Sequence, residues 1–525
     1  MKFISKLVFL LFIQLSFVIN AQQYLGIVGS NYAGTNSIYA NPANSVDSRH
    51  KVFINLAAAD LFIGNNAIKW NAPYSFLKLI SGAVIPSQKL IWRNSYLTAI
   101  ENNKEKNLNA LVELRGPSVL YSIDSKQAVA FTSRGRGAIS FTNVSPEIAK
   151  LMQYGPRNPT IIRSGQDLNM ALNMNAFVEL GISYAKDISL NPEEAIKIGI
   201  SAKRIVGLTN FHMVAKDSDY QLVNDVVNPQ DPSFLYDNVL NIQHIDVKYG
   251  QSDEEAGLND FSLRPGSWIG KDSPGRGFGF DLGISFESRP EIRKYSYKVK
   301  GKQRWDETQN KYAYKIGLSI IDIGRVKFDN PSYVSNYYTV TDNKYVFDNQ
   351  MRLLPISRLV NGINNSLNVG AASSLNSFYS SLPTAIQAYF DYKVKDNYYV
   401  YSTWVQNLRS DNKLGMRMPS LISVVPRYES KWINLAVPLS LLNDYQLLTL
   451  GFSARLGPFF IGSDNLGGLF NLGNPRGMDI YSGLNIPIFN KLPSISTDCY
   501  YEKSERRFQL FKRKPGKRNK GLGQV

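Results

Sequence analysis

The sequence is poor in the side chains that most often carry catalytic or metal chemistry. Among 525 residues there is one cysteine, Cys499, and there are three histidines, His50, His212 and His244. One cysteine excludes an intramolecular disulfide, and the chain has no HExxH pattern and no Cys/His spacing suited to zinc. No histidine stands near Cys499 in the sequence to activate it. We therefore expect no catalytic residues, no metal site and no cofactor.

Apolar runs long enough for a membrane-spanning helix are also missing after the first 21 residues. At the N-terminus, Lys2 and Lys6 flank the start of an apolar run from Leu7 to Ile19, and Ala21 is a small residue suited to signal cleavage. Residues 1–21 are therefore predicted to be a secretory signal peptide. The residue directly after the predicted cleavage position is Gln22 and not cysteine, so we expect export without a lipid anchor.

What the sequence has instead is a strict alternation of apolar and polar residues. Ile386, Phe390 and Val394 share one face of a predicted strand, whereas Asp391 and Lys393 lie on the other face. This is the pattern of a strand between lipid and a water-filled lumen. Aromatic residues make up 12% of the chain and include 30 tyrosines, which suit the interfacial girdles of a barrel. The mean hydropathy of −0.21 fits a membrane protein in which half of each strand faces water.

We predict an all-β fold, a transmembrane antiparallel β-barrel over residues 51–489, in the cell outer membrane. A secreted β-sandwich is the alternative, because its strands also alternate. The two differ in the outward faces of the strands, which are apolar in a membrane barrel and polar in a sandwich. Further strands are expected at 52–58, 178–184, 196–203, 280–287, 433–441, 448–456 and 480–488.

The number of strands is predicted as fourteen, with twelve or sixteen as alternatives, because single-chain bacterial barrels have an even number. Short turns at 189–194, 395–397 and 443–444 contrast with long connections at 213–275 and 330–383. Bacterial barrels show this asymmetry, with short periplasmic turns and long external loops. The apolar spacing from Phe347 to Leu367 predicts one or two short amphipathic helices in the second long connection.

Several charged residues fall on the polar faces of the predicted strands. The candidate lumen-facing residues are Glu179, Lys197, Lys203, Asp281, Glu287, Asp391, Lys393 and Arg455. Such residues either tune the selectivity of a pore or pair with one another inside a closed barrel, and the sequence leaves both roles open.

Two glycine-containing motifs are interpreted as turns or strand ends. Arg134-Gly135-Arg136-Gly137 lies between two apolar stretches and predicts a hairpin turn rather than a phosphate site. Gly275, Gly277 and Gly279 lead directly into an alternating segment, which favours a loop-to-strand edge over a dinucleotide loop.

The C-terminal residues 490–525 are predicted to be a basic, disordered periplasmic tail. From Lys491 to Val525 there are ten Lys or Arg residues and three acidic residues, a surplus of seven positive charges. Anionic lipid head groups or an acidic periplasmic partner would suit this charge. We expect no nucleic-acid partner, because the chain carries an export signal.

Residues 22–50 are polar, weakly periodic and end in two short motifs. Asn41-Pro42-Ala43 is followed by Asp47-Ser48-Arg49 and then by a strand. This order resembles the start of barrels in the FadL-like superfamily of long-chain fatty-acid transporters. The proline-led hairpin from Leu382 to Leu408 resembles the late hairpins of that superfamily. The stretch from Leu456 to Leu466, with Gly477-Met478-Asp479-Ile480, is similar to a poorly characterised group of exported barrels of unknown function.

The resemblance implies that residues 22–50 form a plug in the lumen, with Asn41, Pro42 and Ala43 as its motif. A fourteen-strand barrel is also wide enough to need filling. The function implied is binding or passive transport of a hydrophobic or amphipathic small molecule. The alternative is a non-transporting scaffold, or an accessory barrel for secretion, which binds partner proteins through its loops. The partners are then outer-membrane lipid together with a hydrophobic ligand, or with a periplasmic or cell-surface protein.

Overall fold

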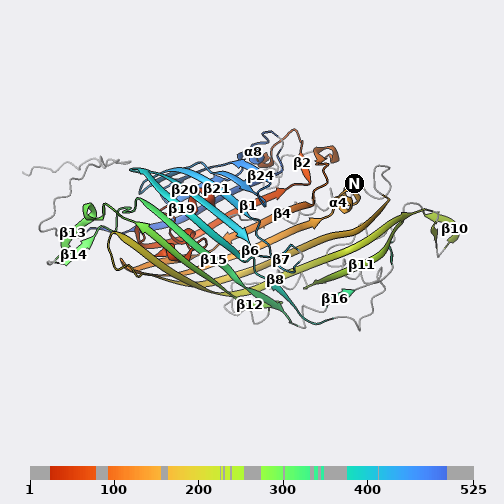
Figure 1. Cartoon of the computed structure of the whole chain (residues 1–525), viewed down its shortest axis with the longest axis horizontal. Helices are drawn as coiled ribbons and strands as arrows, with labels where there is room; N and C mark the ends of the chain where they lie inside the picture. Colours follow the sequence, from red (N-terminus) through yellow and green to blue (C-terminus); the bar gives the residue numbers. More distant parts are fainter. Residues whose placement is uncertain are drawn as a thin grey trace, which may run out of the picture.

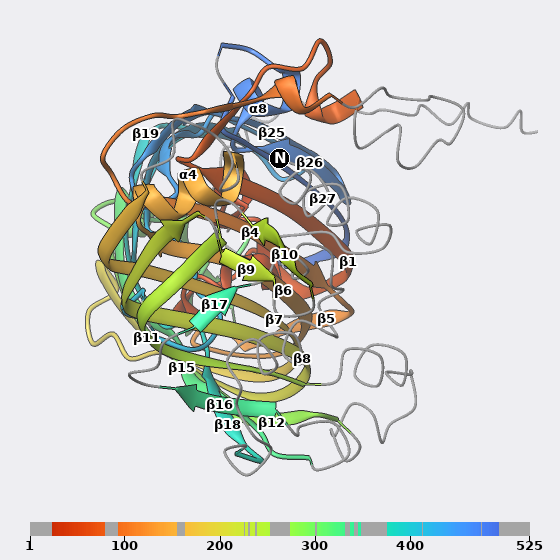
Figure 2. The same cartoon turned by 90° about the vertical axis from the view of Figure 1, so that its right-hand side faces the viewer.

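The computed structural model shows a closed antiparallel β-barrel of fourteen strands, which confirms the predicted fold class (Figures 1 and 2). It describes residues 24–78, 93–154, 163–224, 226–228, 231–236, 239–252, 273–299, 302–330, 336–340, 345–347, 375–411, 413–473 and 475–492. The last strand pairs with the first over thirteen residue pairs, from His50 opposite Phe489 to Gly64 opposite Gly477. The sheet therefore has no open edge along this seam.

The fourteen staves of the barrel follow one another in chain order, and four of them are built from two consecutive segments. They are β1 (His50–Asn65), β4 (Lys106–Arg115) with β5 (Ser118–Asp124), β6 (Gln127–Val144), β7 (Ser164–Asp187), β8 (Glu194–Val223), β12 (Gly275–Ser288), β15 (Tyr314–Phe328), β18 (Phe378–Ser381) with β19 (Ala385–Lys395), β20 (Tyr398–Asn407), β21 (Leu421–Glu429), β22 (Ile433–Ala436) with β23 (Leu439–Leu442), β24 (Leu447–Leu450) with β25 (Phe452–Leu456), β26 (Phe459–Ser463) and β27 (Gly477–Phe489).

The barrel is apolar on its outer surface and polar in its interior, which excludes a soluble sandwich. On β12, Phe278, Phe280 and Leu282 are 62%, 47% and 47% exposed on the outer surface, whereas Asp281 and Glu287 are buried inside. The same alternation holds along β8, β15, β19 and β21. An outer surface of this kind is stable only against an apolar solvent, so these strands span a membrane. Among the described residues, no helix is long and apolar enough to cross a membrane.

The two ends of the barrel differ in their connections. The turns β5–β6, β7–β8 and β19–β20 lie at the end where β1 begins and β27 finishes, here called the short-turn end. The hairpin of β13 (Ser296–Val299) and β14 (Lys302–Trp305), preceded by η5 (Ile292–Tyr295), lies at the same end (Figure 1, left). The turn at Asn443–Asp444 joins β23 to β24 at the opposite, long-loop end. The short turns are therefore not all on one side.

The predicted long connection 213–275 is wrong in its first half, because strands continue through it. β8 extends for 30 residues to Val223, and β11 (Val239–Gln251) pairs with it from Phe211 onwards. β16 (Asn336–Val340) and β17 (Tyr345–Phe347) pair with the other edge of β11, and β9 (Val226–Asn228) pairs with β10 (Asp231–Tyr236). Beyond the apolar belt both strand faces meet water, so the apolar alternation that marks a membrane strand fades. The helix predicted from Phe347 to Leu367 lies outside the described residues, apart from Phe347 itself.

The Arg134-Gly135-Arg136-Gly137 motif is not a hairpin turn, and this prediction is also wrong. It lies in the middle of β6, where Arg134 is paired with Glu179 of β7 and with Arg115 of β4. The glycines alternate with arginines that point inward, so the motif is the interior of a strand with period two. Gly275, Gly277 and Gly279 do begin a strand, β12.

The N-terminal segment lies inside the barrel. Residues 24–49 form α2 (Leu25–Val28), η2 (Gly34–Ser37) and η3 (Pro42–Ser45), and most of their side chains are buried. Seen along the barrel, the strands form a ring around the lumen (Figure 2). Smaller elements at the long-loop end are β2 (Ile68–Trp70), η4 (Asn94–Tyr96), β3 (Leu97–Ala99), α4 (Pro146–Tyr154) and α8 (Leu466–Phe470). The predicted signal peptide, and the predicted tail from residue 493 onwards, lie outside the described residues.

Candidate functional site

The candidate site is the filled lumen, where the N-terminal segment, here called the plug (residues 24–49), meets the barrel wall. Polar contacts join plug backbone to wall side chains at widely separated strands. They connect Leu25 N to Asp464 Oδ2 (3.0 Å), Asn434 Nδ2 to Gly26 O (3.0 Å), Asn31 N to Glu429 Oε2 (3.1 Å) and Ser319 Oγ to Ala40 O (2.6 Å). Since the plug backbone is irregular, these bonds satisfy donors and acceptors that a helix or sheet would otherwise pair.

Asn41 holds the plug motif against the wall. Its Oδ1 accepts from Ala43 N (2.9 Å) and so caps η3, which begins at Pro42. Its Nδ2 donates to two carbonyl oxygens of the wall, Ile284 O on β12 (3.1 Å) and Leu318 O on β15 (3.2 Å). One side chain therefore shapes the local turn and fastens it to two strands.

Two wall glycines make room for this motif. A Cβ at Gly199 would lie 2.4 Å from Ala43 N, and a Cβ at Gly283 would lie 2.1 Å from Asn41 Oδ1. No real Cβ tolerates such distances, so the close approach of plug and wall depends on glycine at both positions. We call Gly199 and Gly283 the plug seat.

A balanced set of buried charges fills the middle of the barrel, and we call it the central ion network. Its members are Glu113, Arg115, Arg134, Arg136, Glu179, Lys203, Asp281 and Asp322, four cations and four carboxylates from six neighbouring staves. Arg134 Nε and Nη1 lie 2.9 and 3.1 Å from carboxylate oxygens of Glu179 and Glu113. Its Nη2 lies 3.2 Å from Asp322 Oδ1. Buried charges are tolerated when each is paired in this way.

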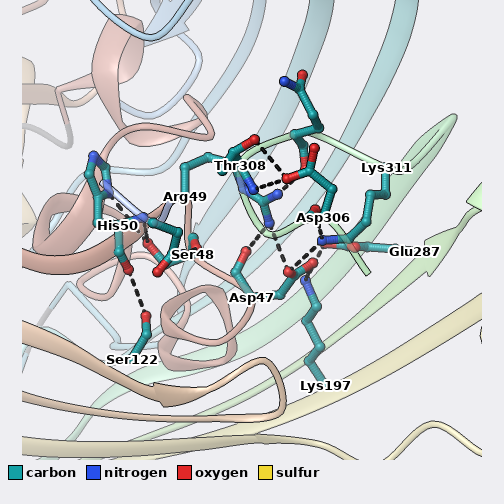
Figure 3. A network of polar contacts seen from close by, with 12 residues as sticks. Asp47, Ser48, Arg49, His50, Ser122, Lys197, Glu287, Asp306, Thr308 and Lys311 are labelled. Carbon is teal, nitrogen blue, oxygen red and sulfur yellow. Dashed lines mark hydrogen bonds and ion pairs between the residues drawn. The ribbon is translucent and has the colours of Figure 1, made fainter. Parts of the chain in front are cut away.

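A second set lies at the short-turn end, and we call it the mouth cluster: Asp47, Arg49, Lys197, Glu287, Arg289 and Lys311. Figure 3 labels all of these residues except Arg289. Asp47 is its centre, with Lys311 Nζ and Arg289 Nη2 each 2.8 Å and Arg49 Nη2 2.9 Å from its oxygens. Burial alone would raise the pKa of Asp47, but the surrounding cations hold the pKa of that carboxyl well below its usual range. The cluster has two more cations than carboxylates.

A third group joins β19 to β21. Arg427 makes two bonds of 2.8 Å to the carboxylate of Asp391 and one of 3.1 Å to Glu429 Oε2. The Tyr312 hydroxyl donates to Asp391 Oδ2 (2.6 Å), and Glu429 accepts the plug backbone at Asn31. This bidentate geometry orders both carboxylates as well as pairing them.

Seven of the eight candidate lumen residues are buried inside the barrel. Glu179, Lys203 and Asp281 belong to the central ion network, Lys197 and Glu287 belong to the mouth cluster, Asp391 pairs with Arg427, and Arg455 donates to Ser430 O. Lys393 is the exception, because it lies at the rim and pairs with the exposed Asp396 (3.1 Å).

Of the fourteen charged residues in the central ion network and the mouth cluster, sequence reasoning identified five as lumen-facing and missed nine. Arg134 and Arg136 were assigned to a turn, although their spacing of two fits a strand face. Asp47, Arg289 and Lys311 lie outside the strands, in segments without periodicity, so alternation could not place them in the lumen, although Asp47 was noted as part of the Asp47-Ser48-Arg49 motif.

Two cavities between these side chains are small, and the first of them is strongly polar. One, of about 40 Å³, is bounded by the plug and the mouth cluster. Another, of about 90 Å³, adjoins it beneath the turns of the short-turn end. Sites for drug-sized ligands span about 300–1,000 Å³ and are mostly apolar, so these two spaces suit waters or small ions instead. In the described part of the chain, no group of three or more His, Cys, Asp or Glu side chains could hold a metal ion.

Several solved structures of outer-membrane proteins share low similarity with the chain. A FadL homologue of Pseudomonas aeruginosa has 9% identity and a TM-score of 0.32, with 86% of this chain and 92% of that chain covered. The toluene transporter TodX of Pseudomonas putida has 8% identity and a TM-score of 0.28, with 89% and 94% covered. The translocator domain of the autotransporter NalP from Neisseria meningitidis has 7% identity and a TM-score of 0.29, with 83% and 88% covered.

No curated protein matches the chain. Membership of the FadL-like superfamily stays a prediction, since likeness at this level does not establish it. A family model does match, over residues 42–464, which run from the plug motif to the start of the β26–β27 connection. The chain belongs to this family of unknown function, DUF5723.

Proposed function

We propose that this outer-membrane barrel is a closed scaffold, which binds partner proteins at its long-loop end and does not conduct solutes in its resting state. The observation that carries the proposal is the filled lumen. The plug, the central ion network and the mouth cluster occupy the interior together, and the cavities of about 40 and 90 Å³ leave room for waters or small ions.

Opening the lumen would require the plug to give up many contacts at once. Each net hydrogen bond is worth about 0.5–1.5 kcal/mol, and breaking a buried ion pair by removing one partner costs about 3–5 kcal/mol. The plug contributes Asp47 to the mouth cluster, so its departure would leave Lys311 and Arg289 without that carboxylate. The closed arrangement is therefore strongly favoured.

The long-loop end offers a folded surface for a partner. β8 and β11 extend beyond the apolar belt, and β16 and β17 widen this sheet (Figures 1 and 2). A paired sheet beyond the apolar belt offers a partner an ordered backbone without the entropic cost of ordering a loop.

The proposal can be tested with a disulfide that fixes the plug to the barrel wall. Ala40 and Ser319 are neighbours, because Ser319 Oγ donates a hydrogen bond of 2.6 Å to Ala40 O. A disulfide between cysteines at these two positions, in a Cys499→Ser background, would tether the plug to β15. We expect the oxidised protein to keep partner binding, measured by site-specific crosslinking from β11 in cells, and to keep any deletion phenotype complemented. Loss of complementation on oxidation, with recovery on reduction, would contradict the scaffold. The single-cysteine variants are the controls for oxidation itself.

Passive transport of a hydrophobic or amphipathic small molecule is the second candidate, and one feature of the wall favours it. β27 pairs with β26 only over residues 481–484. Closer to the long-loop end, α8 contacts both β27 and β24. A short helix in place of strand pairing is a weaker part of the wall. Uptake of a hydrophobic dye into proteoliposomes by the untethered protein, abolished by the plug tether, would support transport.

A further inference from the structure

The smaller cavity at the short-turn end has a surplus of positive charge. It lies between the plug and strands β8, β12, β15 and β19. Its charged lining residues are Asp47, Arg49, Lys197, Glu287, Lys311 and Lys315, four cations against two carboxylates. Ser48 is partly buried at the short-turn end of this cavity, whereas the Asp47 side chain is only 6% exposed.

Lys315 is the cation of this lining that the protein does not pair. Lys311 and Arg49 contact Asp47, and Lys197 contacts Glu287. The ammonium of Lys315 lies 5.4 and 5.5 Å from the ring centroids of Tyr312 and Tyr389. Among the described residues, it has no carboxylate within ion-pair distance and no hydrogen-bond acceptor. A charge in such a confined place is stabilised when a counter-ion joins it.

A neutral donor stands in the same lining. The Tyr389 hydroxyl donates to Asn44 Oδ1 at 2.5 Å, which assigns the other end of that amide as an NH₂ donor. Asn44 belongs to the plug and Lys315 to the wall, so a ligand held by both would bridge them. Amide and ammonium donors together suit an oxyanion, which accepts several hydrogen bonds and carries the compensating charge.

The size of the cavity limits the ligand. A single water needs about 10–15 Å³ on the scale on which this cavity measures about 40 Å³, so a few waters or one small oxyanion would fill it. The adjoining cavity of about 90 Å³ shares Asp47 and Lys311 and is walled partly by Leu190, Ile292 and Trp305. An apolar group attached to the oxyanion could extend there.

We infer that this cavity is a binding site for a small oxyanion, either free phosphate or the carboxylate of an amphipathic molecule, held by Lys315 and Asn44 between plug and wall. Neither the family nor the scaffold proposal requires such a site, and it does not depend on partner binding. Occupancy would add a bridge between Asn44 and Lys315 and so fasten the plug more firmly.

The test is titration calorimetry on the purified full chain in detergent, in a low-salt zwitterionic buffer, with inorganic phosphate, acetate and octanoate as probes. We expect saturable binding of at least one probe by the wild type and a loss of tenfold or more in Lys315→Gln and in Asn44→Ala. Lys393→Gln is the matched control, because it removes the same charge from the rim and should bind as the wild type does.

The three probes separate the two sources. Phosphate binding alone identifies the free ion. Octanoate binding that is tighter than acetate binding, and that is weakened by Trp305→Ala, identifies an amphipathic carboxylate. Heat-modifiable gel migration checks that each variant is folded, and the probe that binds should raise the unfolding temperature of the wild type more than that of Lys315→Gln. Absence of saturable binding to all three probes, or equal affinity in wild type and a folded Lys315→Gln variant, would overturn the inference.

Discussion

Arg134 shows how much one side chain can contribute to the interior of this barrel. Its guanidinium meets three carboxylates, those of Glu113, Glu179 and Asp322, at 2.9–3.2 Å. Replacing it by alanine would leave these anions short of one shared partner, and we expect Arg134→Ala to lower the free energy of unfolding by about 3–5 kcal/mol. The temperature at which gel migration changes from folded to unfolded reports this loss.

The matched control for that experiment is Arg276→Ala. Arg276 is 47% exposed and lies 3.5 Å from Asp329, so its removal should change stability by about 0.5 kcal/mol or less. Equal effects of the two substitutions would show that the central ion network does not stabilise the barrel beyond an ordinary surface pair.

Lys311 gives the oxyanion site a dependence on pH. The pKa of this ammonium is lowered to about 8, chiefly by burial; Asp47 opposes the shift, and Arg49 and Arg289 contribute to it. Lys197, Glu287, Glu307, Tyr312 and Lys315 also face this region. Below pH 8 Lys311 is a cation, and above it the charge is lost, so the affinity for the oxyanion should fall between pH 7 and pH 9. Titration calorimetry at both pH values measures the change.

Lys311→Arg is the variant that isolates this effect, because a guanidinium keeps its proton at pH 9. Its affinity should be nearly constant over the same range. A wild-type affinity that does not change between pH 7 and pH 9 would exclude Lys311 as the titrating group.

Alternation could place residues on the lumen face, but it could not say which of them would meet. Glu179 and Lys203 were identified by their position on a polar strand face, and they lie in the same network. Arg134 was missed, because a run in which arginine and glycine alternate is also the composition of a turn. The alternation with period two along the whole of β6 is better evidence for a strand than this four-residue motif is for a turn.

At the scale of the element, the contact between plug and wall rests on the plug seat. We expect Gly283→Val to expel the plug motif, because a side chain there would overlap Asn41 by more than 1 Å. The barrel itself should still assemble, since valine suits a strand and the ladder of β12 with β8 and β15 is unchanged. Limited proteolysis of the plug in the folded barrel should become fast in this variant.

Gly135→Ala is the control for the plug seat, because nothing lies within 4 Å of a Cβ at that position on β6. It should leave the plug protected. A plug that stays protected in Gly283→Val would mean that its other bonds, rather than the seat, hold it in place.

Apart from the middle of β6, the elements within the apolar belt could be predicted from the sequence, whereas β11, which lies beyond the belt, could not. The expected segments at 280–287 and 480–488 lie in β12 and β27. The sequence predicts a loop in place of β11. Neither face of this strand contacts lipid, so its sequence lacks the apolar alternation that a lipid-facing strand requires.

At the scale of the whole molecule, the barrel could be predicted because lipid and lumen impose one rule on every strand. The way the plug fills it could not, since its bonds join positions such as Leu25 and Asp464, which are 439 residues apart. No local pattern in the sequence records such a pairing.

The closed state leads to a prediction for the whole barrel. Deleting residues 24–46 removes the plug but keeps Asp47 and the start of β1, so the fourteen staves can still close. The full-length protein should show no steady conductance in a planar bilayer, whereas the deletion variant should conduct, because water replaces the plug in a lumen lined by polar side chains. The ion pairs of this variant would be wet, so its unfolding temperature should become sensitive to salt. A deletion variant that inserts, migrates as a folded barrel and remains closed would show that the ion networks alone seal the lumen, and the plug would then have some role other than closure.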